Sequence, residues 1–335
     1  MALLFDRHPS VTSPALAPAQ DEAGRAGPVE VTIGLINNMP DSALKATERQ
    51  FLRLLRTAAG DTPIRFHCFS LPSMVRSAAA RRHVAQDYTD IAELDDLRFD
   101  GLIVTGAEPN AQSLPEEPFW RELTAVIDWA QSHTHSTIFS CLAAHAAVLH
   151  LDGIGRQRLG AKCSGVYDCA TLRDHWLTRD LPAKVKVSHS RFNALRESDL
   201  AAHGYQVLTR SEQAGIDIFA RQHDSHFIFF QGHPEYDASS LQREYMRDLA
   251  RFLSRERDNY PAIPTGYFDA ATERLLTDFE ARARALRDPM LAAELPGLTL
   301  RPDIPAGNAA AIIFRNWLGF LGEEARASQP ASWRK

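Results

Sequence analysis

The chain has 335 residues, 44% of them apolar, and its 42 acidic and 37 basic residues give a formal net charge of −5. This length suits one large α/β domain with extensions, and the negative charge argues against nucleic acid or an anionic membrane as a partner. Because no apolar run could cross a bilayer and the start lacks signal-peptide character, we expect a cytoplasmic protein with reduced thiols.

The N-terminal half alternates strand and helix patterns after an irregular start. Residues 1–28 are rich in Ala, Pro, Ser and Gly without periodicity, so we expect a disordered lead-in. Asp41 is expected to cap the first helix, and the Ala78–Asp87 stretch is expected to be a helix or an active-site flap. The expected strands are Val31–Ile36, Ile64–Ser70, Phe99–Gly106 and Ser136–Ser140, and further helices are expected at Phe119–Gln131 and after Cys141.

The C-terminal half has a different pattern. Several short strand-like runs between Lys162 and Phe230 predict a mixed or antiparallel extension of the sheet. Helical periodicity returns in three later segments, Leu241–Arg257, Glu273–Leu286 and Ala309–Leu321. We therefore predict an α/β fold, with a mostly parallel sheet flanked by helices and a C-terminal helical extension. The predicted division is a lead-in at 1–28, a catalytic domain at 29–258 and a helical extension at 259–335 packed on the same domain.

Cys141 lies where a short apolar strand pattern changes into an Ala- and Leu-rich helix pattern. A lone cysteine in such a stretch is usually a small buried hydrophobe. At a helix N-terminus, however, the helix dipole and the free N–H groups favour a thiolate and can receive an oxyanion. The backbone N–H of Leu142 is the expected oxyanion donor.

A second chemical motif, Gly232-His233-Pro234-Glu235, follows the strand pattern that ends at Phe230. His233 could act as general base to a cysteine, with Glu235 orienting the imidazole. In a parallel sheet the active site lies at the carboxyl ends of the strands, so we expect Gly106, Cys141 and His233 to converge. Together the two motifs favour a catalytic pair over two unrelated structural residues.

The other cysteines show no metal-binding pattern. Cys68, Cys163 and Cys169 lie far apart or are separated by an expected strand, and we therefore predict no metal site.

Seven ordered motifs resemble those of the homoserine O-acyltransferases, which have a class I glutamine-amidotransferase-like fold of the flavodoxin-like, three-layer kind. The similarity runs from about Val31 to Leu321. It rests on Asn38-Met39-Pro40, Phe51–Leu55, Phe99–Ala107, Lys162 with Ser164–Tyr167, His189–Phe192, Gly232–Ala238 with Arg247-Asp248, and Asn316–Leu318.

The resemblance implies a role for each matching position. Cys141 matches the nucleophile that takes the acyl group from acyl-CoA, His233 the general base, and Glu235 the carboxylate of the triad. The substrate-binding positions match Lys162, Ser190 and Arg247, and Asn110 matches the position linked to acyl-donor choice. Acyl-CoA is expected as co-substrate with no permanently bound cofactor, the other partner is a small hydroxy amino acid, and the chain could form a homodimer.

The chain departs from the family pattern after the nucleophile and in the C-terminal region. Leu142 and His145 replace Trp and Gln, and residues 270–305 resemble an inserted helix. The expected activity is acyl transfer to the hydroxyl of homoserine in methionine biosynthesis. A succinyl donor is slightly favoured because Asn110 is neutral. Transfer to serine or another hydroxy amino acid, a glutaminase activity and a non-catalytic binding module remain as alternatives.

Overall fold

The computed structural model describes residues 3–5, 29–295, 297–304 and 308–328. Within them, ten strands form one sheet in the order β1-β3-β2-β4-β5-β10-β9-β8-β6-β7. The strands are β1 (Leu3–Phe5), β2 (Val31–Ile36), β3 (Ile64–Phe69), β4 (Phe99–Val104), β5 (Thr134–Ser140), β6 (Gln157–Thr171), β7 (Lys184–Ala194), β8 (Gln206–Ser211), β9 (Gly215–Gln222) and β10 (His226–Phe230).

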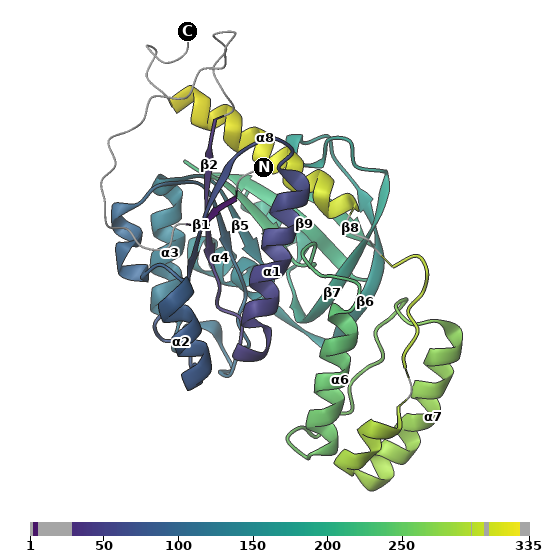
Figure 1. Cartoon of the computed structure of the whole chain (residues 1–335). Helices are drawn as coiled ribbons and strands as arrows, with labels where there is room; N and C mark the ends of the chain where they lie inside the picture. The colour runs from purple at the N-terminus through teal and green to yellow at the C-terminus, as the bar shows by residue number, and fades with distance from the viewer. Residues whose placement is uncertain (1–2, 6–28, 296, 305–307, 329–335) are drawn as a thin grey trace.

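Eight α-helices accompany the sheet in this part of the chain (Figure 1). They are α1 (Asp41–Ala58), α2 (Ala78–Asp87), α3 (Trp120–His133), α4 (Leu142–Asp152), α5 (Glu197–Ala202), α6 (Ser240–Leu253), α7 (Ala270–Leu286) and α8 (Asn308–Ser328). None of the helices in the described ranges is long and apolar enough to cross a membrane.

The sheet changes from parallel to antiparallel at β10. Strands β1 to β5 and β10 pair in parallel, whereas β10, β9, β8, β6 and β7 form antiparallel pairs. The register pairs Phe230 of β10 with Ser140 of β5, although 90 residues separate them in the chain. The predicted α/β fold with an antiparallel extension is confirmed, and the ends of β5 and β10 become neighbours.

Two hydrophobic cores cover the two faces of the sheet. Along β4, Leu102 and Val104 belong to the core that includes α3 and α4, and Ile103 belongs to the core that includes α1 and α8. Successive side chains of a strand point to opposite faces, so a strand buried on both sides has a continuous apolar sequence. The uninterrupted apolar pattern of β4 therefore reflects its place in the middle of the sheet.

Helix α8 completes the layer beside α1 (Figure 1). A side chain at Gly101 would approach Trp317 and Leu321 of α8 to within 2.8 Å, so glycine lets the helix lie directly on β4. The Trp317 indole donates a hydrogen bond to Ser136 Oγ at 3.0 Å, and Asn316 donates to the carbonyl of Leu177 at 3.0 Å. These contacts explain two of the motifs on which the family resemblance rests.

Helices α6 and α7 form a third core away from the centre of the sheet (Figure 1). Leu249 and Phe252 of α6 are buried in it together with Leu276 and Phe279 of α7. The stretch that departs from the family pattern thus packs against the helix that follows His233.

Two local expectations were wrong. The predicted lead-in at 1–28 includes Leu3–Phe5, which forms β1 and pairs in parallel with β3; residues 6–28 lie outside the described residues. An open sheet edge leaves backbone N–H and C=O groups unpaired, and β1 covers that edge. Asp41 does not cap α1 but begins it, because Pro40 is the capping residue and the Asp41 carboxylate accepts the Ser77 N–H at 2.7 Å.

Candidate active site

Cys141 lies between β5 and α4 in a backbone conformation that is unusual for a residue with a side chain. Its φ of 53° and ψ of −111° lie in a region that L-residues rarely adopt. The Cys141 N–H donates to the Phe230 carbonyl at 2.7 Å, which ties the turn to the end of β10. Strain of this kind persists where surrounding contacts fix it, and it often marks functional sites. The turn leaves Cys141 partly exposed between flanking residues, Ser140 and Leu142, that are buried.

His233 and Glu235 form a buried pair just beyond β10. His233 Nδ1 lies 2.8 Å from Glu235 Oε1. An ionised carboxylate can only accept hydrogen bonds, so Nδ1 carries the proton and donates the hydrogen bond to Glu235. The second ring nitrogen, Nε2, takes no part in this bond. Nε2 is buried and has no hydrogen-bond partner within standard distance and angle limits among the described residues. Pro234 therefore does not turn the carboxylate of Glu235 away from the imidazole.

The surroundings of His233 favour its protonated form. Burial alone would lower the pKa of His233, but the charge of Glu235 and interactions with the Cys141 side chain raise this pKa well above its usual value. The Tyr236 ring stacks on the imidazole at a centroid distance of 4.2 Å and limits its movement. Cys141, His233 and Glu235 are thus brought together, and their role as a catalytic triad stays a prediction.

The backbone N–H of Leu142 is available at the start of α4. No acceptor for it is found among the described residues. A Cβ at Gly106, in the loop after β4, would lie 3.0 Å from this nitrogen, so glycine there leaves space in front of the amide. An N–H at a helix N-terminus can stabilise the oxyanion of a tetrahedral intermediate.

The predicted substrate-binding residues line a cavity of about 150 Å³ beside Cys141, and this cavity is named here the charged cavity. Lys162 Nζ lies 3.1 Å from Asp248 Oδ2, and Arg247 Nη2 lies 3.1 Å from Asp248 Oδ1. The Ser190 hydroxyl donates to Glu244. Lys162, Ser190 and Arg247 therefore share one cavity with the thiol, and their role in substrate binding stays a prediction.

Two carboxylates in the charged cavity stay ionised, although Asp248 is buried and Glu244 is partly buried. Burial would raise the pKa of both Glu244 and Asp248, but the charge of Lys162 and further hydrogen bonds lower each pKa below its ordinary value. Arg257 also lies 3.1 Å from Asp248. The cavity thus offers positive and negative groups together, which suits an amino acid that carries an ammonium and a carboxylate.

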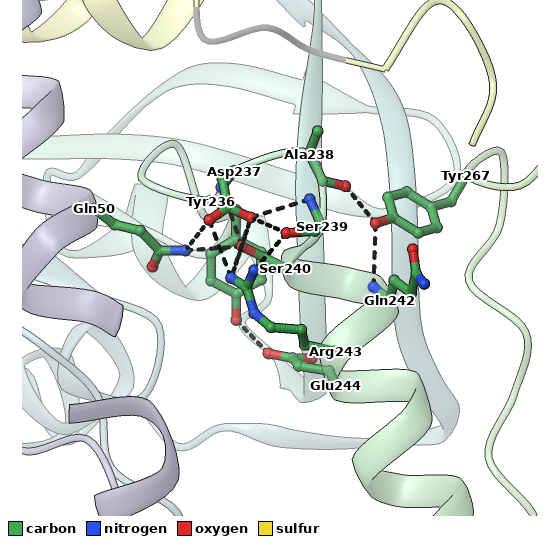
Figure 2. Close-up of polar contacts among 10 residues, drawn as sticks. All are labelled: Gln50, Tyr236, Asp237, Ala238, Ser239, Ser240, Gln242, Arg243, Glu244 and Tyr267. Carbon is green, nitrogen blue, oxygen red and sulfur yellow. Dashed lines mark hydrogen bonds and ion pairs between the residues drawn. The ribbon is translucent and has the colours of Figure 1, made fainter. Parts of the chain in front are cut away.

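The turn after Glu235 fixes the start of α6 (Figure 2). The hydroxyl groups of Ser239 and Ser240 each donate to Asp237 Oδ1 at 2.9 Å, and Gln50 of α1 donates to Ser240 Oγ at 2.8 Å. Further along the helix, the Tyr236 hydroxyl donates to Glu244 at 2.5 Å. These bonds link the position of Glu244 to the residues that follow His233.

A larger cavity of about 730 Å³ also has Cys141 in its lining and is named here the large cavity. Asn110 is exposed on its wall, and the Asn110 N–H donates to Glu117 Oε1 at 2.7 Å. His145 also lines the cavity, and burial together with nearby arginines lowers the pKa of His145 to about 3, so its imidazole is neutral. His145 therefore faces the cavity and is not a surface histidine of α4.

One buried group beneath His233 has side chains that could bind a metal ion. The ligand atoms of Cys169, His189 and Asp217 all lie within 4.8 Å of one another. Asp217 already lies 3.4 Å from His189 Nε2 and accepts the Thr209 hydroxyl at 2.8 Å. The Asp217 backbone carbonyl accepts the Gln231 N–H at 2.8 Å. We interpret the group as support for the turn that carries His233.

Sequence reasoning missed the charged partners in both cavities. Glu244 and Asp248 were not predicted as site residues, although Glu244 lies three residues before Arg247 and four before Asp248, the spacings that bring side chains together on one face of a helix. Glu117 and Arg156 in and near the large cavity had no recognisable motif. Helical spacing could have revealed Glu244 and Asp248. The positions of Glu117 and Arg156 depend instead on how distant segments of the chain pack together.

Comparison with known proteins identifies the family of the chain. A sequence profile described as homoserine O-succinyltransferase matches residues 14–327. A homoserine O-succinyltransferase of Bradyrhizobium japonicum is 61% identical over 324 residues, covering 96% of this chain and 100% of the relative. The chain belongs to the homoserine O-succinyltransferase family. It is therefore an acyltransferase, and the predicted family is confirmed.

A second relative in the homoserine O-succinyltransferase family, from Rhodopseudomonas palustris, is 54% identical, with 97% of this chain and 100% of the relative covered. Among solved structures, a glutamine amidotransferase of Thermotoga maritima has 13% sequence identity and a TM-score of 0.48, with 78% of this chain and 95% of that chain covered.

Proposed function

We propose that the protein transfers a succinyl group from succinyl-CoA to the hydroxyl of L-homoserine through a thioester on Cys141, in methionine biosynthesis. The observation that carries this proposal is the position of Cys141, which lines both the charged cavity and the large cavity. A nucleophile between two cavities can accept a group from one side and pass it to the other. The names of the relatives, both homoserine O-succinyltransferases, support homoserine as acceptor and succinyl as the acyl group.

In the first half-reaction, the Cys141 thiolate attacks the thioester carbonyl of the donor. A protonated His233 stabilises this thiolate, and its raised pKa supports that state at neutral pH. The Leu142 N–H receives the developing oxyanion. When the tetrahedral intermediate collapses, the C–S bond to CoA breaks and the leaving thiolate takes the proton from His233.

In the second half-reaction, the neutral His233 accepts the proton of the homoserine hydroxyl while the oxygen attacks the acyl-enzyme. Acylation removes the thiolate charge of Cys141, one of the groups that raise the pKa of His233. The pKa of His233 is thus higher in the free enzyme, where the imidazolium stabilises the thiolate, and lower in the acyl-enzyme, where the imidazole stays neutral and is free to accept a proton. Collapse of the second intermediate restores the thiolate and the imidazolium.

Mass spectrometry of the intact protein after mixing with succinyl-CoA or acetyl-CoA tests this proposal. We expect one succinyl group on Cys141 that disappears when homoserine is added. Steady-state rates with homoserine and serine then identify the acceptor. A protein that forms no adduct but hydrolyses glutamine would be a glutaminase, and transfer to serine alone would contradict homoserine as the acceptor.

Replacement of Arg247 by Gln is expected to raise the KM for homoserine by about ten- to a hundredfold, with a much smaller change in the KM for succinyl-CoA. Arg247 lines the charged cavity, and a charge-assisted bond to a carboxylate contributes about 1.5–3 kcal/mol. Steady-state kinetics with each substrate varied in turn measures the effect. Arg284→Gln, at an exposed position of α7, is the control and should leave both values unchanged. A larger rise in the KM for the donor would place Arg247 in the donor site.

Replacement of Glu235 by Gln is expected to move the alkaline limb of the pH profile of kcat/KM for succinyl-CoA to lower pH. The negative charge of Glu235 helps to raise the pKa of His233, so its removal lets the imidazolium lose its proton earlier as the pH rises. The loss of rate should be smaller than for removal of His233, because the amide can still orient the ring. An alkaline limb at the same pH in both proteins would contradict this role of Glu235.

A further inference from the structure

Arg156 lines the large cavity and is a cation without a hydrogen-bond or ion-pair partner in the part of the chain that the structure describes. It is half-buried, and it makes no hydrogen bond, ion pair or ring contact with any described residue. The neighbouring arginines differ from it. Arg191 donates to the carbonyls of Asn193 and Ala214, and exposed Arg158 lies over the Phe192 ring at 5.2 Å. A half-buried guanidinium with no counter-ion is unfavourable unless a ligand supplies the negative charge.

Arg156 lies close enough to the nucleophile for their charges to interact. Burial lowers the pKa of Arg156, and the charges of Glu117 and Cys141 oppose that change. Glu117 forms no ion pair with Arg156. Its Oε1 accepts the N–H groups of Asn110 and Ala111 at 2.7 and 2.8 Å. The cation therefore belongs to the part of the large cavity that an acyl group on Cys141 would enter.

We propose that Arg156 binds the terminal carboxylate of the succinyl group in the donor and in the acyl-enzyme. This inference rests on the proposed function and names a residue that determines donor specificity. A guanidinium can bind a carboxylate through two parallel hydrogen bonds, and an acetyl group offers it no such partner. Arg158 lines the same cavity but is exposed, so we assign it to the phosphate groups of CoA. These groups leave the cavity with CoA after the first half-reaction.

Kinetics of Arg156→Gln with three donors tests the proposal: succinyl-CoA, acetyl-CoA and the succinyl thioester of N-acetylcysteamine, which has no phosphate. We expect kcat/KM to fall by about ten- to a hundredfold with both succinyl donors and to change little with acetyl-CoA. Retained activity with acetyl-CoA also shows that the variant is folded. Arg156→Lys should restore part of the loss, because lysine keeps the charge without the planar pair of donors.

Arg158→Gln is the matched control, because it removes the same charge from the same cavity. It should leave the ratio of succinyl-CoA to acetyl-CoA use unchanged. An equal shift in that ratio would mean that a long-range field, not contact with Arg156, selects the donor. Loss with both CoA donors but not with the N-acetylcysteamine thioester would assign Arg156 to the CoA phosphates. If the wild-type protein uses no succinyl donor, the proposed function fails. If the wild type uses succinyl-CoA and Arg156→Gln has the same kcat/KM for it, this inference alone fails.

Discussion

Cys141→Ala is expected to abolish both the covalent adduct and turnover while leaving the fold intact. Loss of the nucleophile in a covalent enzyme can cost up to about 10⁶-fold in kcat. The unusual backbone angles of Cys141 penalise any Cβ, and alanine keeps the Cβ, so the stability should change little. Intact mass after mixing with succinyl-CoA, steady-state rates and thermal unfolding measure these three effects.

Cys163→Ala is the control for the loss of a thiol. Cys163 is partly buried in β6, and its replacement should leave the adduct and the rate intact. An acyl group of the same mass on the Cys141→Ala protein would show that another residue is the nucleophile.

His233→Asn is expected to lower kcat by about 10²–10⁴-fold with a modest change in either KM. The imidazole supplies the positive charge for the thiolate, the proton for CoA and the base for the homoserine hydroxyl, so both half-reactions should slow. Single-turnover measurements of acylation and of transfer to homoserine separate the two steps. Turnover near that of the wild type would remove His233 from the mechanism.

His189→Asn provides a comparison with a histidine that only supports the turn. His189 is fully buried beneath His233, and burial together with the charges of Arg191 and His233 lowers the pKa of His189 well below its usual value. Replacement of His189 should lower the melting temperature of the protein and leave the pH profile of kcat/KM nearly unchanged. Equal effects of the two variants on the rate of acylation would argue that His233 acts through structure alone.

The sequence by itself determined the elements and the ends of the strands. Apolar runs such as Val31–Ile36 and the helical spacing of Leu241–Arg257 depend on local side-chain patterns, and the structure contains strands or helices at both. Cys141 and His233 could be assigned to strand ends for the same reason. Their convergence followed from a general property of parallel sheets, in which the carboxyl ends share one edge.

Only the tertiary structure decided which charges meet and which remain free. The pairing of β5 with β10 joins segments 90 residues apart, and no local pattern specifies that register. The ion pair of Asp248 with Lys162 joins α6 to β6, and Arg257 reaches Asp248 from the segment that follows α6. That Arg156 has no hydrogen-bond or ion-pair partner among the described residues likewise depends on every neighbouring segment. Sequence patterns report burial and local conformation, whereas the electrostatics of the site arises from distances that folding alone sets.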